Sequence, residues 1–116
     1  MQTSGKSALV DLVHWNGELG ALTAEAGRVS VAPGEEVVAL DRSAARNSLQ
    51  MFVAGLADAN DLENWAEKVH ELDGIGVEVG HEDVLTQFLF EISTPDLFEP
   101  ITIELCRRWI EILQGE

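Results

Sequence analysis

The spacing of hydrophobic residues along this chain of 116 residues changes near Asp41. After that point apolar side chains recur every three or four positions, which is typical of helices with one buried face. Before it, short apolar runs stand between turn-forming residues, which favours strands. The sequence therefore predicts an α+β fold, in which a small N-terminal β-meander or hairpin over about 8–40 packs on a three- to four-helix C-terminal part over about 41–114.

Turn signals mark the N-terminal part. Asn16-Gly17 is the dipeptide that best supports a tight hairpin, because both positions tolerate a positive φ. Val29 and Val31 then alternate, after a turn at Gly27 and before one at Pro33-Gly34. Residues 8–13 stay ambiguous between strand and helix, because the apolar side chains there also share a helical face: Leu9, Leu12 and Val13.

Four helices are expected after residue 41, and capping residues give their starts. Asp41 or Ser43 caps the first, which ends near Gly55. Asp58 or Asn60 caps the second. The third begins around residues 81–83 and Pro95 ends it, and the fourth follows Thr102 and ends at Gly115.

Each helix carries one apolar stripe that we expect to be buried. Trp65 and Trp109 fall on these stripes, which predicts core positions for both rings, whereas Trp15 beside Asn16-Gly17 is open to either environment. The stripes are Ala45, Leu49, Phe52, Val53 and Leu56; Leu62, Trp65, Ala66, Val69 and Leu72; Val84, Leu85, Phe88, Leu89 and Ile92; and Cys106, Trp109, Ile110 and Leu113.

The stretch HELDGIGVEVGHED, residues 70–83, resembles a metal site in composition. Zinc sites use ligand pairs three or four positions apart on a helix, and no such histidine pair occurs in the chain. The segment from Asp58 has Leu62, Glu63 and Val69 where a calcium loop needs a ligand, a glycine and a glutamate. We therefore expect no metal here, and the glycines predict a turn between the second and third helices.

Catalytic and cofactor motifs are also missing from the sequence. Cys106 lies among Leu105, Trp109 and Ile110, as a core residue would. The serines stand in no Gly-x-Ser-x-Gly motif, and GIGVEVG fits no dinucleotide or phosphate loop. We expect no enzyme activity, no catalytic residue and no cofactor.

Composition limits the class of protein. The length fits one domain over 1–116, and 46% hydrophobic with 24% charged residues is ordinary for a globular chain. No apolar run approaches the roughly 18 residues of a membrane span, and we expect no signal peptide. The single cysteine excludes an internal disulfide and favours a cytoplasmic location.

Charge carries the strongest functional signal. Seven Lys and Arg against 21 Asp and Glu give a net charge of −14, which disfavours binding to nucleic acid or to an anionic membrane. Residues 69–106 contain no Lys or Arg and nine carboxylates. Such a surface either keeps the protein in solution or steers a basic protein partner into contact. The candidate partner-binding residues are Glu63, Glu67, Glu71, Asp73, Glu78, Glu82 and Asp83.

The passage ADANDLENWAEKVHELDGIGVEV, followed by HEDVLTQFLFEISTPDLFEPIT, resembles the helical core of small acidic bacterial immunity proteins. The resemblance covers roughly residues 43–114 and lies in size, acidity and the DLENWA helix opening. It implies a non-enzymatic inhibitor that binds one colicin-like, contact-dependent or polymorphic toxin domain and masks its basic active site with carboxylates.

The expected function is therefore an immunity protein whose acidic face neutralises a cognate toxin. Two alternatives stay open: a phage-encoded inhibitor that mimics DNA, and a small enzyme or ligand-binding accessory domain whose pocket no motif identifies. The sequence leaves the oligomeric state undetermined.

Overall fold

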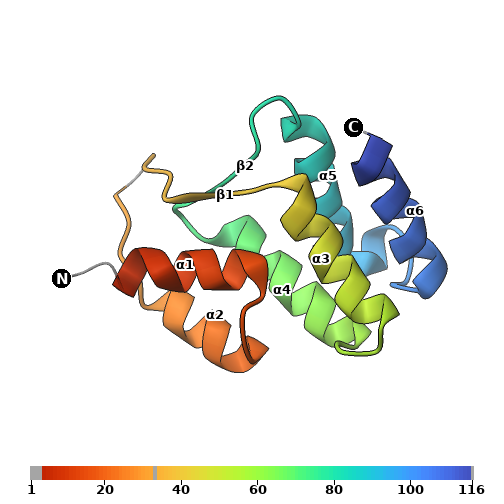
Figure 1. The fold of residues 1–116 in the computed structure, drawn as a ribbon, viewed down its shortest axis with the longest axis horizontal. Helices are drawn as coiled ribbons and strands as arrows, with labels where there is room; N and C mark the ends of the chain where they lie inside the picture. Colours follow the sequence, from red (N-terminus) through yellow and green to blue (C-terminus); the bar gives the residue numbers. More distant parts are fainter. Residues whose placement is uncertain (1–3, 33, 116) are drawn as a thin grey trace.

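The computed structural model describes residues 4–32 and 34–115. Within these residues the chain forms six α-helices, two short strands and one 3-10 turn (Figure 1). Of the predicted turn at Pro33-Gly34, Pro33 lies outside the described residues. The elements are α1 (Ser4–His14), α2 (Leu19–Gly27), β1 (Val38–Leu40), α3 (Arg42–Val53), α4 (Ala59–Glu71), β2 (Ile75–Val77), α5 (Glu82–Ser93), η1 (Pro95–Leu97) and α6 (Ile103–Gly115).

The predicted N-terminal β-meander is wrong, because two helices, α1 and α2, form at residues 4–14 and 19–27. Of the two conformations left open for residues 8–13, the helical one is present, and it buries Leu9, Leu12 and Val13 together. The described residues of 28–37 form no strand, so Val29 and Val31, which were predicted to lie on a strand, lie in a loop. The fold is consequently mostly helical rather than an α+β fold with an N-terminal sheet.

The Asn16-Gly17 dipeptide forms a turn between helices instead of a hairpin. Trp15 and Gly17 both have positive φ values, 55° and 135°, and the Asn16 amide donates to the Asp11 carbonyl at 2.9 Å. Glu18 then caps α2, since its carboxylate accepts from the Gly20 and Ala21 amides at 3.0 Å each. Positive φ supports both kinds of turn, so the dipeptide alone did not distinguish a helical hairpin from a β-hairpin.

The two strands come from opposite halves of the chain and pair in parallel. Val38 faces Ile75 and Leu40 faces Val77, so α3 and α4 form the crossover that parallel strands require. Residues 75–77 had been expected to form part of a turn between helices. They form β2 instead, because pairing with β1 satisfies backbone groups that a plain turn would leave to water.

The four predicted C-terminal helices are present, and several predicted caps are confirmed. Asp41 accepts from the Ala44 amide at 2.8 Å, and Asp58 forms a reciprocal capping box with Asp61. The Thr102 hydroxyl accepts from the Leu105 amide at 3.1 Å. Leu56 is the clear exception among the predicted stripes: it lies beyond the end of α3 and is 74% exposed.

Four aromatic rings run through the core and connect the N-terminal pair of helices to the rest. Trp15 stacks on Trp65 with a centroid distance of 5.7 Å, and Phe88 makes edge contacts with Trp65 at 6.3 Å and Trp109 at 5.5 Å. The Trp65 indole donates to the Leu12 carbonyl at 2.8 Å. Trp65 and Trp109 are therefore core residues as predicted, and Trp15, which the sequence left open, is buried as well.

Gly74 occupies the tightest backbone position between α4 and β2. Its φ is +92°, and a Cβ built there would lie 3.0 Å from Val31 Cγ2 and 3.1 Å from Leu9 Cδ1. Its carbonyl accepts from the Val37 and Val38 amides at 2.7 and 3.1 Å. Gly74 thus lets the loop after α2, helix α1 and the start of β2 approach one another closely.

We expect Gly74→Ala to destabilise the fold more than Gly80→Ala. Both glycines have φ near +92°, which costs an L-residue about 1–2 kcal/mol. Nothing lies within 4 Å of a Cβ at Gly80, whereas the crowding at Gly74 adds roughly 1–3 kcal/mol. Urea unfolding followed by tryptophan fluorescence measures both variants, and equal midpoints for the two would contradict this packing.

Candidate interaction site

Three of the candidate carboxylates, Glu63, Glu67 and Glu71, lie on α4 at i, i+4 and i+8 and form a ridge along the helix. Glu67 and Glu71 are exposed, while Glu63 is half-buried. Glu71 pairs with the Lys68 ammonium at 3.3 Å, across an exposed (i, i+3) spacing that contributes little stability. The ridge is therefore acidic, and Lys68 offsets part of its charge.

The remaining exposed candidates are divided between the two ends of β2. Asp73 follows α4, and Glu82 and Asp83 form the first turn of α5, where they complement the helix dipole. Helices α4 and α5 pack against each other and run in opposite directions (Figure 1). Strand β2 lies between Asp73 and Glu82, so these exposed candidates form two separate acidic segments.

Glu78 differs from the other six candidates, because it is part of the folded framework. Its Oε1 accepts from the Arg42 amide and from Arg42 Nε, each at 3.0 Å, and its Oε2 accepts from Arg42 Nη2 at 3.2 Å. The Glu78 amide donates to the Leu40 carbonyl at 2.9 Å, which extends the strand pairing. The side chain thereby caps the N-terminus of α3 beside Asp41, and both partners are only 29% exposed.

The pairing also changes the acidity of Glu78. Side-chain and backbone hydrogen bonds from Arg42 hold its pKa below the ordinary value of 4.5, and the positive charges of Arg42 and His81 add to this effect. Arg42 and Glu78 are 36 positions apart in the chain, so no local spacing predicts the pair. Only the parallel register of β1 and β2 brings them together.

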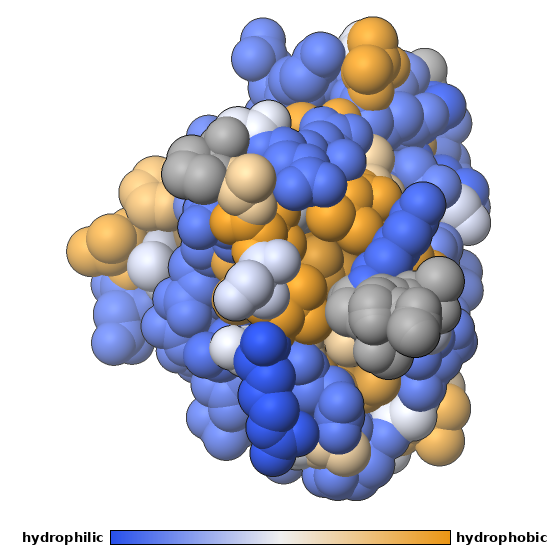
Figure 2. All heavy atoms as spheres, turned by 90° about the vertical axis from the view of Figure 1, so that its left-hand side faces the viewer, coloured by the Kyte–Doolittle hydropathy of each residue, from blue (hydrophilic) through white to orange (hydrophobic). Residues whose placement is uncertain are grey.

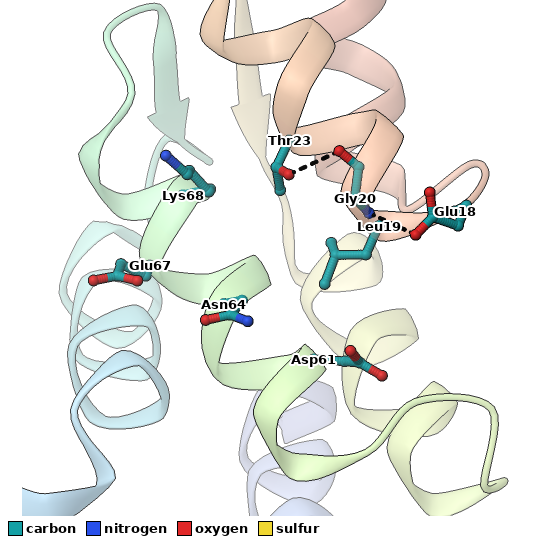
Figure 3. A pocket seen from close by; sticks show the side chains of 8 residues that line it. All are labelled: Glu18, Leu19, Gly20, Thr23, Asp61, Asn64, Glu67 and Lys68. Carbon is teal, nitrogen blue, oxygen red and sulfur yellow. Dashed lines mark hydrogen bonds between the residues drawn. The ribbon is translucent and has the colours of Figure 1, made fainter.

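A groove of about 430 Å³ lies between α2 and α4 (Figure 3). On the α4 side, Asp61, Asn64, Glu67 and Lys68 line it, opposite Glu18 and Thr23. The sequence did not single out Glu18 or Asp61 as site residues. Both carboxylates accept backbone hydrogen bonds at helix starts, and the Thr23 hydroxyl donates to the Gly20 carbonyl. The groove therefore adds negative charge beside the ridge but pairs no nucleophile with a base.

The face at the left of Figure 1 combines the start of α1, the end of α2 and the loop residues 28–32 and 34–37. Figure 2 shows hydrophobic side chains in the middle of this face, surrounded by hydrophilic ones. Val29, Val31 and Val37 are half-buried there and pack against the core. These valines cover the hydrophobic core from this side and leave part of their own surface open.

Other side chains with catalytic or ligating chemistry are dispersed. Burial raises the pKa of the Cys106 thiol to about 11, so the thiol stays protonated at neutral pH and is a poor nucleophile. Across residues 4–32 and 34–115, no three His, Cys, Asp or Glu side chains are grouped so that they could hold a metal ion. Within the same residues, every helix is too short or too polar to cross a membrane.

No family model, no curated protein and no solved structure matches this chain. Its function is consequently argued from the described residues.

Glu78→Gln should reduce the dependence of stability on acid pH. Because folding lowers the pKa of Glu78, the ionised carboxylate stabilises the fold fully above about pH 4.5, and this contribution is lost as the pH falls through the lower pKa of the folded state. The variant should thus be less stable than the parent at pH 7, with a gap that narrows toward pH 3. Urea midpoints at the two pH values measure this, with Glu111→Gln on α6 as an exposed control. A gap that is constant with pH would show that the Arg42 pairing does not favour the ionised form.

Proposed function

We propose that this protein is a non-enzymatic inhibitor, an immunity protein that binds a basic bacterial toxin domain and covers its active site. It acts in the cytoplasm, where a chain with one cysteine needs no oxidising environment. Its exposed carboxylates take the positions that substrate phosphates would occupy on the toxin.

The distribution of charge is the observation that carries this proposal. Residues 69–106 hold nine carboxylates and no Lys or Arg, within a chain of net charge −14. Five of the seven candidate side chains are exposed: Glu67, Glu71, Asp73, Glu82 and Asp83. Fields of this kind raise the rate of encounter with a basic partner and make it sensitive to salt.

Glu78 does not belong to the contact surface in this proposal. Its carboxylate already bonds Arg42 in two places, and a partner cation would have to replace those bonds. The two half-buried candidates therefore differ in role: Glu63 extends the α4 ridge, and Glu78 holds the fold behind it.

Affinity capture from the source cell tests the proposal directly. The tagged protein is immobilised at low ionic strength, bound proteins are eluted with a salt gradient, and each is identified by mass spectrometry. We expect a basic toxin domain that elutes as salt rises, and its activity should fall when the purified inhibitor is added. Capture of no basic protein, or binding that is unchanged by salt, overturns the proposal; a captured DNA-binding protein would instead favour a DNA mimic.

Charge reversal of Glu67, Asp73 and Asp83 should slow association with the captured toxin domain. Long-range attraction acts mainly on the association rate, so three reversals should lower it at least tenfold while the circular dichroism spectrum stays unchanged. The matched control reverses Glu25, Glu35 and Glu111, which are exposed and outside the candidate set. Stopped-flow kinetics distinguishes the two, and an equal effect of both triple variants would show that net charge, not this surface, sets the rate.

A further inference from the structure

An exposed aromatic pair lies at the C-terminal end of α5. Phe90 and Phe98 make an edge contact with a centroid distance of 5.2 Å, and they are 40% and 44% exposed. Leu97, directly before Phe98, is 70% exposed. We call these three side chains the Phe90 patch; grouped exposed apolar side chains of this kind are typical of interaction sites.

The local backbone holds this patch in a defined geometry. The Thr94 hydroxyl and the Ser93 hydroxyl both donate to the Phe90 carbonyl, and the Phe98 amide donates to the Pro95 carbonyl at 3.1 Å. Pro95 begins the 3-10 turn η1 that carries Leu97. The apolar side chains therefore stand on hydrogen-bonded backbone, which lowers the entropy lost when a partner binds.

The same outer face of α5 connects the patch to the acidic residues. Asp83, Gln87 and Phe90 follow the i, i+4, i+7 spacing of one helix face, and all three are exposed. Seven residues of helix place the Phe90 backbone about 10 Å from that of Asp83. One face therefore presents a carboxylate near one end and an aromatic pair at the other.

Carboxylates flank the patch in the chain. Glu91 is adjacent to Phe90 and Asp96 to Leu97 in the chain, and Glu99 follows Phe98. Arg108 of α6 reaches this region, but its guanidinium pairs with Glu99 at 2.7 Å. An occupant of the patch should therefore combine apolar side chains with Lys or Arg.

We propose that the Phe90 patch is the apolar anchor of the interface with a basic protein partner, which inserts a hydrophobic side chain beside Phe90 and Phe98 and places Lys or Arg near Asp83. This rests on the proposed function, which supplies a basic partner. A second copy of this chain fits less well, because two chains of net charge −14 would bring carboxylates against carboxylates. Carboxylates guide the encounter, and the apolar contact slows dissociation.

Synthetic peptides probe the patch without knowledge of the partner. The first is a 16-residue amphipathic peptide with Leu on one helical face and Lys on the other. A second has Ser in place of Leu, and a third has Glu in place of Lys. We expect the Lys/Leu peptide to shift the amide NMR signals of α5 and of residues 94–99, and the other two to bind at least tenfold more weakly.

Variants of the patch locate the contact. Phe90→Ser with Phe98→Ser should weaken binding of the Lys/Leu peptide at least tenfold. Leu97→Ser, which removes a side chain that is 70% exposed and leaves the fold intact, should weaken this binding severalfold. Leu56→Ser is the matched control, since Leu56 is 74% exposed outside the patch. Circular dichroism confirms that each variant is folded.

The outcomes separate this inference from the proposed function. If the peptide binds the parent and the Leu97→Ser and Phe90→Ser/Phe98→Ser variants equally, or shifts signals only elsewhere, the patch is not an anchor, and capture of a toxin domain can still succeed. If the patch variants bind the Lys/Leu peptide more weakly but no basic protein is captured from the cell, this inference holds and the proposed function is wrong. Sedimentation that shows a dimer dissociated by Leu97→Ser would assign the patch to self-association and overturn the inference.

Discussion

The ring of Trp65 sets the arrangement of the helices around it. It stacks on Trp15 and meets the edge of Phe88, while its indole nitrogen donates to the Leu12 carbonyl at 2.8 Å. Large aromatic side chains dominate core energetics, and a buried indole needs a hydrogen-bond partner. One residue of α4 thereby fixes the end of α1 on one side and α5 on the other. The surface on which α4 and α5 carry their carboxylates depends on this contact.

The pairing of the two strands makes one candidate carboxylate, that of Glu78, part of the folded framework. Parallel pairing of β1 with β2 brings Glu78 to the start of α3. There its carboxylate accepts two hydrogen bonds from the Arg42 guanidinium and one from the Arg42 backbone amide. Of the six other candidate residues, five are exposed and Glu63 is half-buried, whereas Glu78 and Asp41 accept hydrogen bonds in the first turn of α3. The charge of the chain is thus divided between helix capping and open surface.

Negative charge and exposed apolar surface act on different stages of binding. Carboxylates attract a basic partner over a distance that salt limits, whereas an aromatic contact forms only when water has left the interface. The outer face of α5 carries both features, with Asp83 and the Phe90 patch at its two ends. A protein that inhibits by covering a basic surface needs both a high association rate and slow release, and this face offers a physical basis for each.

The sequence by itself determined the four C-terminal helices, several of their caps and most of their buried stripes, because periodicity and capping act within a few residues. It misassigned the N-terminus, where Asn16-Gly17 and alternating valines fit a β-hairpin, whereas the fold buries Leu9 and Leu12 on one helical face and bonds the Leu12 carbonyl to the Trp65 indole. It located the acidic region, since charge is a property of composition. It did not place Glu78 on Arg42 or bring Phe90 to Phe98 at the surface. Those contacts depend on strand register and on the path of the chain after Pro95, which the tertiary structure alone decides.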